Sequence, residues 1–466
     1  MKLSFLIFAL LALIIIFYFV GYAVATLPFR ITIVLIVGFI FAALTLIDLQ
    51  IGLYLLIFVV PFTQQARVGS FVGSFHAPVD IGTDDIFIVF ILLSWLANLI
   101  RRREPLFLKT PLNWPIIAFF TAAILSFVGS PIFGFGTGEV LVGALHLFKF
   151  FEYVVVYFVV ISTIENLEQI KKFLKMFFVV TALIAIVQVI AMATTGHFSL
   201  STAPLGRYSL LYLTAMYSFV SNAILGAYYI FFVCILLALI LYTPASEGKI
   251  PLILFCFFLS YTLFNTFSRS AYVGLLAGFF VLATKEKRFF LILLLFVVLS
   301  PIYMESAVLE RITFTIQSKG LGPIRLDESS TIRLFIWKKA IEAFWQNPFF
   351  GLGYWGIRYY LHNTAHSQYL NTLAETGIVG FSAFSWMLFS MLKNATNLMK
   401  KAESSFFKAL GLGYTAGLVG VLVSCIFSEN LEAYHLVGPI WFVTGLITSA
   451  NRLLSEKVEN SGVDST

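Results

Sequence analysis

Residues 218–242 read SFVSNAILGAYYIFFVCILLALILY, a run of 25 residues with no charged side chain. At about 1.5 Å of rise per residue, a helix of this length crosses a hydrocarbon core of about 30 Å. Lipid offers the backbone no hydrogen bonds, so a crossing segment must satisfy its own N–H and C=O groups, as a helix does. The stretch therefore predicts a transmembrane helix.

Similar apolar runs recur along the whole chain, which is 60% hydrophobic and 11% charged. This composition excludes an ordinary soluble globular domain and indicates a polytopic membrane protein. We predict an all-α fold, a single membrane domain over residues 1–466 that is a helical bundle of about 12–14 transmembrane helices. The expected spans lie near residues 4–22, 28–46, 49–63, 84–100, 112–130, 143–162, 173–194, 218–242, 250–267, 270–284, 289–304, 376–393, 408–428 and 435–450.

Basic residues cluster between these spans on one predicted side of the membrane. The clusters are residues 101–103, 171–172, 285–288 and 400–401. Short loops rich in Lys and Arg stay in the cytoplasm, so this side is expected to be cytoplasmic. The polar tail at 451–466 falls on the same side, and its composition predicts disorder.

Residues 305–375 form a long polar segment that cannot span a bilayer, and the topology places it on the opposite, external face. Long loops translocate regardless of their charge, so its basic residues are interpreted as functional. Ser329-Ser330-Thr331 predicts a helix start, and apolar residues from Ile332 to Phe344 follow at helical spacing. Asn347-Pro348 should stop this helix, and a second one should begin near His366.

Three arginines are expected on the external face. Arg269 lies at a break between two spans, Arg207 lies in an external segment, and Arg333 lies on the loop helix. An arginine at a break in the membrane is costly without a partner, and snorkelling towards the headgroups is the simpler explanation for Arg269. Guanidinium groups also bind phosphate oxygens with paired donors, so together the three predict a diphosphate ligand.

His366 is the candidate general base, because imidazole titrates near neutral pH and can accept a proton from a hydroxyl. His362 is a competitor, and a hydrogen-bonded structural histidine remains the alternative for either residue. Glu375 is interpreted as orienting the base or a sugar, or as beginning the next span.

Two further charged pairs have structural and functional interpretations. Lys149 and Glu152 fall three residues apart within a span and share a helical face, as structural glue or as a functional pair. Asp84 and Asp85 begin a span, where capping is the commoner role and a divalent ion the other. No group of His, Cys, Asp and Glu in the sequence has convincing metal spacing, so neither a metal nor another cofactor is expected.

Two sequence blocks resemble the O-antigen ligase and O-antigen polymerase superfamily of bacterial membrane glycosyltransferases. The first, residues 268–275, reads SRSAYVGL and is similar to the family's Ser-Arg block entering a span. The second includes Arg333, residues 347–353 (NPFFGLG), His366-Ser367-Gln368-Tyr369-Leu370 and residues 374–380 (AETGIVG). The family usually has Asn after its histidine, whereas this chain has Ser367, which leaves the role of that position open.

The resemblance implies transfer of a glycan from an undecaprenyl-diphosphate carrier to a hydroxyl, with inversion and without a metal, at the periplasmic face of a bacterial inner membrane. Arg269 and Arg333 would hold the diphosphate and His366 would activate the acceptor, as catalytic residues. The expected substrate-binding residues are Arg207, Glu375, Tyr369 and Arg358.

The expected partners are the lipid-linked donor, membrane lipid and an acceptor, with no nucleic acid. The acceptor is lipid A-core for a ligase, a second lipid-linked glycan for a polymerase, or an exported protein. The high span count favours a polymerase slightly. The alternative from another class is a lipid-linked oligosaccharide flippase, which the intramembrane charges Lys149 and Glu152 would suit.

Overall fold

The computed structural model describes residues 38, 40–62, 65–68, 79–103, 105, 108–195, 221–244, 248–285, 287, 290, 316–317, 325–326 and 328–463. Two compact units divide the chain, residues 1–56 with 84–106, and residues 57–83 with 107–466. Each unit is described by itself. The predicted span at 4–22, nearly all of the span at 289–304, most of the span at 28–46, and Arg207 lie outside the described residues.

The first unit contains most of helix α3 (Leu49–Val59) and of helix α4 (Thr83–Arg102). Ser94 Oγ of α4 donates a hydrogen bond of 2.8 Å to the carbonyl of Thr45. The predicted acidic helix start is present, because Asp84 and Asp85 lie in the first turn of α4 and Arg101 and Arg102 lie in its last turn. This order of charge complements the helix dipole.

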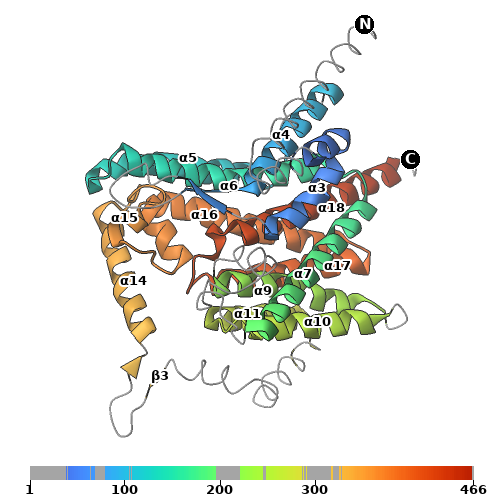
Figure 1. Cartoon of the computed structure of the whole chain (residues 1–466). Helices are drawn as coiled ribbons and strands as arrows, with labels where there is room; N and C mark the ends of the chain where they lie inside the picture. The colour runs from blue at the N-terminus through green and yellow to red at the C-terminus, as the bar shows by residue number, and fades with distance from the viewer. Residues whose placement is uncertain are drawn as a thin grey trace, which may run out of the picture. The chain divides into compact units, whose positions relative to one another are not determined.

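The second unit holds the remaining elements (Figure 1). Two short antiparallel strand pairs join β1 to β2 and β3 to β4. The elements are η1 (Val60–Phe62), β1 (Gln65–Val68), β2 (Val79–Gly82), α5 (Asn113–Ser126), η2 (Phe127–Phe133), α6 (Thr137–Thr163), α7 (Leu167–Thr195), α9 (Asn222–Tyr242), α10 (Lys249–Phe264), α11 (Arg269–Lys285), β3 (Ile316–Gln317), β4 (Arg325–Leu326), α14 (Glu328–Gln346), α15 (Ile357–Leu361), α16 (Gln368–Lys401), α17 (Ser405–Ser424), η4 (Asn430–Glu432) and α18 (Tyr434–Val463).

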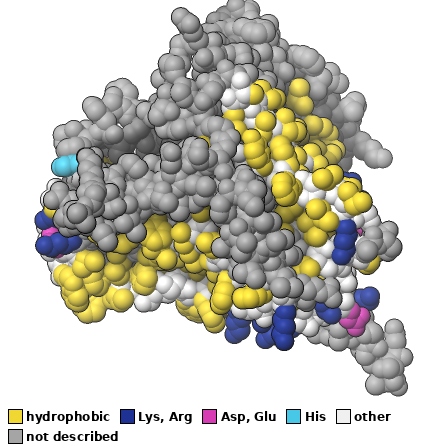
Figure 2. Space-filling view, turned by 90° about the horizontal axis from the view of Figure 1, so that it is seen from below, with side chains coloured by type: hydrophobic (Ala, Val, Ile, Leu, Met, Phe, Trp, Pro, Cys, Tyr) yellow, Lys and Arg dark blue, Asp and Glu magenta, His cyan; other side chains and the backbone are white. Residues whose placement is uncertain are grey.

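Six helical segments among the described residues are long and apolar enough to cross a membrane. They are Asn113–Phe133, Thr137–Thr163, Leu167–Ala193, Asn222–Tyr242, Gln368–Lys401 and Ser405–Ser424. The prediction of a polytopic helical bundle is therefore confirmed. Large apolar side chains lie on the outside, such as Phe257 of α10, which is 75% exposed, and Figure 2 shows yellow patches of them. In a membrane protein such a surface faces lipid.

The helices of the second unit pack closely through small residues. A Cβ added at Gly274 of α11 would lie 2.5 Å from the carbonyl oxygen of Gly420 in α17, and the reverse distance is 2.7 Å. Without side chains between them, the two backbones touch, as is common where helices associate in membranes. This contact explains the glycine of the SRSAYVGL block, because Gly274 lets α11 pack directly against α17 in the turns that follow Arg269.

Helix α16 breaks at Gly377, whose φ of 62° and ψ of −169° are not helical. A break leaves carbonyl groups without helical partners, and the preceding loop bonds to them. The N–H of Leu352 donates to Ala374 O at 2.8 Å, and the N–H of Gly353 donates to Glu375 O at 2.9 Å. The turn at 351–353 is thereby fixed against the start of α16.

The described part of the polar segment 305–375 contains the two predicted helices. Helix α14 ends at Gln346, directly before Asn347-Pro348, and its inner face buries Ile336, Ala340 and Ala343. Ile332 and Phe335 belong to the predicted apolar face but are 49% and 62% exposed. The first turns of α14 extend away from α16 in Figure 1, so only its later turns are covered.

The C-terminal ends of α6 and α16 contact the later turns of α18. Arg452 donates to the carbonyl of Ile164 at 2.7 Å, and Lys401 Nζ contacts Ser455 Oγ at 3.1 Å. Helix α18 continues past Asn451 to Val463, and these bonds hold its later turns. The prediction of a disordered tail from residue 451 is therefore wrong for residues 451–463. Lys400 and Lys401 lie in the last turn of α16, at the end of the helix away from His366.

Candidate active site

Arg358 forms the centre of a charged cluster at the start of α16. Its guanidinium forms an ion pair with Glu432 of η4 and lies 3.5 Å from Oε1 of Glu375. The Arg358 side chain is 17% exposed, so these charges have left most of their water. The predicted residues Arg358 and Glu375 are thus brought together, but they bind each other.

Burial and charge act in opposite directions on this cluster. Burial alone would lower the pKa of Arg358, but the carboxylates of Glu432, Glu375 and Glu429 raise it. For Glu432, burial raises the pKa of the carboxyl, and the nearby Arg358 offsets only part of that shift. Arg358 therefore stays charged, and it holds the short η4 helix against α15.

A hydrogen-bonded chain connects this cluster to His366. Glu432 Oε1 accepts a bond of 3.1 Å from Asn371 Nδ2, and Asn371 Oδ1 accepts a bond of 2.9 Å from the N–H of Ala365. Ala365 immediately precedes His366 in the sequence. The position of the histidine backbone thus depends on the Arg358 cluster.

His366 lies just before α16, with a φ of 50°, and its side chain is 38% exposed. The Thr364 hydroxyl donates to Glu429 Oε1 at 2.9 Å, which uses its single hydrogen. The same oxygen lies 3.2 Å from His366 Nδ1, so it must accept a hydrogen from that nitrogen. This arrangement protonates Nδ1 of a neutral imidazole and leaves Nε2 as the base.

Glu429 supports the ring from the loop that joins α17 to α18. Its Oε2 lies 3.6 Å from Nδ1 of His366, which is a charge contact rather than a hydrogen bond. Burial raises the pKa of Glu429, but the contact with His366, the hydrogen bond from Thr364 and the charge of Arg358 outweigh burial and lower it. A carboxylate held in this state stabilises an imidazolium ion when the ring takes up a proton.

The other predicted residues occupy separate elements. Arg269 is the first residue of α11, after a break from α10 as predicted, and it is half-buried. Arg333 is half-buried on α14. The Tyr369 hydroxyl donates to Leu422 O at 2.7 Å, which fastens α16 to α17. His362 ends α15 with a φ of 53° and is exposed.

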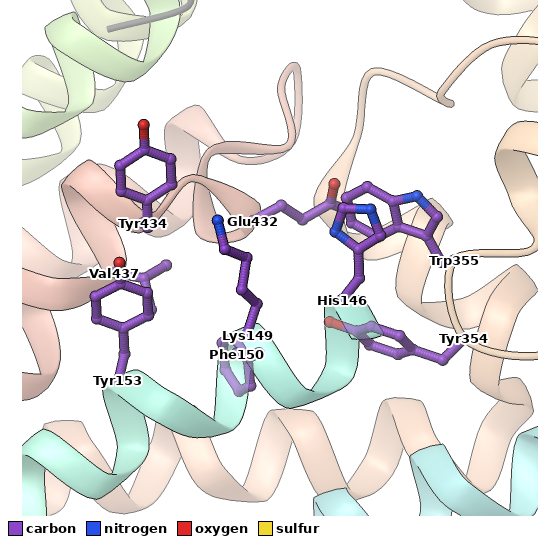
Figure 3. Close-up of a pocket in the computed structure, with 9 residues that line it drawn as sticks. All are labelled: His146, Lys149, Phe150, Tyr153, Tyr354, Trp355, Glu432, Tyr434 and Val437. Atoms are coloured by element: carbon purple, nitrogen blue, oxygen red, sulfur yellow. The ribbon is translucent and has the colours of Figure 1, made fainter. Parts of the chain in front are cut away.

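A pocket lies beside the charged cluster (Figure 3). Lys149 of α6 points into it, with Nζ 5.2 Å from the centre of the Tyr434 ring. The lining residues are His146, Lys149, Phe150, Tyr153, Tyr354, Trp355, Glu432, Tyr434 and Val437.

Sequence reasoning missed several residues of this region, namely His146, Trp355, Glu429 and Glu432. One signal was available, because Glu429 and Glu432 are two acids in a short loop between the last two predicted spans, on the side predicted to be external. His146 and Trp355 carry no such signal, since their contact exists only in the fold.

A comparison with protein families matches the part of the chain that holds several of these residues. A family model described as O-antigen ligase matches residues 252–385, a segment that includes Arg269, Arg333, Arg358 and His366. No curated protein matches the chain. Residues 252–385 thus match the O-antigen ligase family, and the predicted resemblance of this chain to the O-antigen ligase and polymerase superfamily is confirmed.

Proposed function

We propose that this O-antigen ligase-type membrane glycosyltransferase moves a glycan from an undecaprenyl-diphosphate carrier to a hydroxyl acceptor on the external face of a bacterial inner membrane. The observation that carries the proposal is the arrangement of His366, Thr364 and Glu429 inside or beside the matched domain. It presents an imidazole whose Nε2 is free to act as a base.

The proposed reaction is a single displacement. His366 Nε2 removes the proton of the acceptor hydroxyl, and the acceptor oxygen forms a bond to the anomeric carbon. The bond from that carbon to the phosphate oxygen breaks at the same time, which inverts the carbon and releases the polyprenyl diphosphate. Glu429 stabilises the imidazolium ion that results.

The leaving diphosphate carries the negative charge that develops in this step. We propose that Arg269 and Arg333, with Arg207, hold it by forked guanidinium bonds. Guanidinium groups supply the positive charge, so the proposed mechanism uses no metal ion. Glu375 and Arg358 act here by positioning η4, which revises the substrate-binding roles that the sequence predicted for them.

The distribution of charge supports the external assignment. Lys400 and Lys401 end α16 at the side opposite to His366. Lys285 likewise ends α11, whose first residue is Arg269. Because cytoplasmic loops carry the excess of Lys and Arg, the side of His366 and Arg269 is proposed to be periplasmic or extracellular.

The test compares the wild type with a His366→Asn variant, using a polyprenyl-diphosphate oligosaccharide and candidate acceptors in EDTA. His362→Asn is the matched control, because both histidines have φ near 50° and asparagine tolerates that conformation. We expect transfer by the wild type and the control but not by His366→Asn. The acceptor that is glycosylated distinguishes ligase, polymerase and protein glycosyltransferase.

Other outcomes would reject the proposal. Equal transfer by all three proteins would remove His366 from the chemistry. Movement of the lipid-linked donor across proteoliposomes, with no transfer to any acceptor, would instead support a flippase, for which Lys149 in the pocket of α6 is the favouring observation.

A further inference from the structure

The pocket beside Glu432 has an aromatic wall in a strained conformation. Trp355 has a φ of 70°, which is rare for a bulky residue and indicates strain that the surrounding contacts maintain. The His146 ring stacks on the Trp355 ring with centroids 3.7 Å apart and planes 12° apart. Because the Arg358 guanidinium lies 3.3 Å from the same ring centre, the two groups occupy opposite faces of the indole. The edge of Trp355 therefore borders the pocket.

A second aromatic wall comes from Tyr153 of α6 and Tyr434 of α18. Their rings lie parallel within 14°, with centroids 6.5 Å apart. Figure 3 shows the Lys149 side chain rising from α6 between Tyr434 and Glu432. The pocket thus combines several aromatic rings with one amine and one carboxylate.

The pairing of an amine, Lys149, with a carboxylate, Glu432, favours a sugar over a phosphate as the ligand. A phosphate group offers only acceptors and is repelled by a carboxylate, so a site built for phosphate collects donors alone. A sugar hydroxyl both donates and accepts, so it can bond to Glu432 and Lys149 together. The C–H groups of a sugar ring are apolar and pack against aromatic side chains.

We propose that this pocket is a carbohydrate subsite, which holds one sugar of the glycan by its hydroxyl groups between Lys149 and Glu432 and by its ring against the aromatic walls. The cavity measures about 40 Å³, room for a few water molecules. A hydroxyl or hydroxymethyl group fits inside, and the sugar ring lies across the mouth.

The subsite adjoins the proposed base. Glu432 belongs to the pocket and accepts the bond from Asn371, which in turn holds the backbone just before His366. A sugar bound at Glu432 would therefore be placed relative to the imidazole by the same chain of bonds. The inference rests on the proposed function, and transfer assays decide whether the sugar belongs to the donor or to the acceptor glycan.

Binding is measured on the full-length protein in nanodiscs, with the oligosaccharide repeat released by mild acid from the lipid-linked pool of the source cells. Saturation-transfer NMR detects sugar protons that contact the protein. Trp355→Gly is the informative variant, because glycine adopts a positive φ without strain and should keep the fold. Trp345→Gly on α14, a ring that is 71% exposed, is the control for loss of an indole.

We expect the signal to fall roughly tenfold in Trp355→Gly and in Lys149→Met, and to stay unchanged in Trp345→Gly. Equal signals in Trp355→Gly and Trp345→Gly would overturn the subsite. Competition by inorganic pyrophosphate that disappears in Lys149→Met would also overturn it, because the pocket would then bind the diphosphate.

Steady-state transfer assays separate the two possible sources of the sugar and separate this inference from the proposed function. Pocket variants should raise KM for one substrate, the donor or the acceptor, by roughly tenfold while kcat changes less. His366→Asn should abolish transfer and still bind the released oligosaccharide. If His366→Asn kept its transfer activity, His366 would not be the base. The carbohydrate subsite would still be judged separately, by sugar binding in the pocket variants.

Discussion

Glu429 Oε2 lies 3.6 Å from His366 Nδ1, although the two residues flank different helices, α17 and α16. Thr364 joins them, since its hydroxyl donates to Glu429 and its oxygen lies 3.2 Å from Nδ1. A carboxylate that fixes a histidine tautomer also stabilises the protonated ring. The relationship therefore predicts that Glu429 matters to transfer without touching the substrate.

Glu429→Gln should lower kcat by roughly ten- to a hundredfold, because a contact to the imidazolium charge contributes about 1.5–3 kcal/mol and each ~1.4 kcal/mol is a factor of ten in rate. Glutamine keeps the size and one acceptor oxygen, so Thr364 can still bond to it, but the negative charge is gone. Glu403→Gln is the control, because Glu403 is exposed after the far end of α16. Transfer rates at saturating donor and acceptor provide the measurement, and equal rates for both variants would contradict the role of Glu429.

The same carboxyl predicts how stability depends on pH. Although burial opposes the shift, the contact of Glu429 with His366 and its hydrogen bond from Thr364 hold its pKa below the ordinary value of 4.5. A carboxyl with a lowered pKa stabilises the fold fully above its unfolded pKa, and the contribution is lost as the pH falls through the folded pKa. The difference in Tm between wild type and Glu429→Gln should therefore be constant above about pH 5 and shrink in more acidic buffer. A difference that grew on acidification would contradict this sign.

Arg358→Met should destabilise the protein by about 3–5 kcal/mol, because it leaves Glu375 and Glu432 buried without their cation. Their side chains are 4% and 10% exposed. Changing both carboxyls to amides in the same protein should recover part of the loss. Thermal unfolding in nanodiscs measures the effect.

An exposed ion pair provides the control for Arg358. Lys339 and Glu342 on α14 are 44% and 40% exposed, and solvent screens such pairs. Lys339→Met should therefore leave Tm unchanged. A loss as large as that of Arg358→Met would indicate that removal of any basic side chain from the loop destabilises the protein.

The sequence predicted the helical bundle well because long apolar runs determine membrane helices almost alone. It also predicted the helix break before Arg269 and the stop at Asn347-Pro348, where local residue types decide the backbone. The helix after Asn451 was not predicted, because contacts between residues distant in sequence, such as Arg452 and Ile164, hold it.

The candidate site was predicted only in part for the same reason. Arg358 and Glu375 were recognised as charged loop residues, but their mutual contact depends on how α15 turns back onto α16. Trp355 gave no sequence signal at all. Its stacking against His146 joins residues more than 200 positions apart, and its positive φ follows from that packing rather than from its residue type.

The break in α16 depends on Gly377, whose backbone is not helical. A Cβ at this position would lie 2.3 Å from the carbonyl oxygen of Phe349, and the φ of 62° disfavours any other residue. Gly377→Ala should therefore push the turn at 349–353 away from α16 and lower both Tm and transfer. Gly134→Ala is the matched control, since its φ is 73° but nothing lies within 4 Å of the added Cβ. The control should lose only the cost of a left-handed residue, about 1–2 kcal/mol, because its ψ is 16°. Gly377→Ala should lose about 1–3 kcal/mol more, from the clash and from its ψ of −169°, a conformation open almost only to glycine. Equal losses in the two variants would show that the loop can move away from α16 without cost.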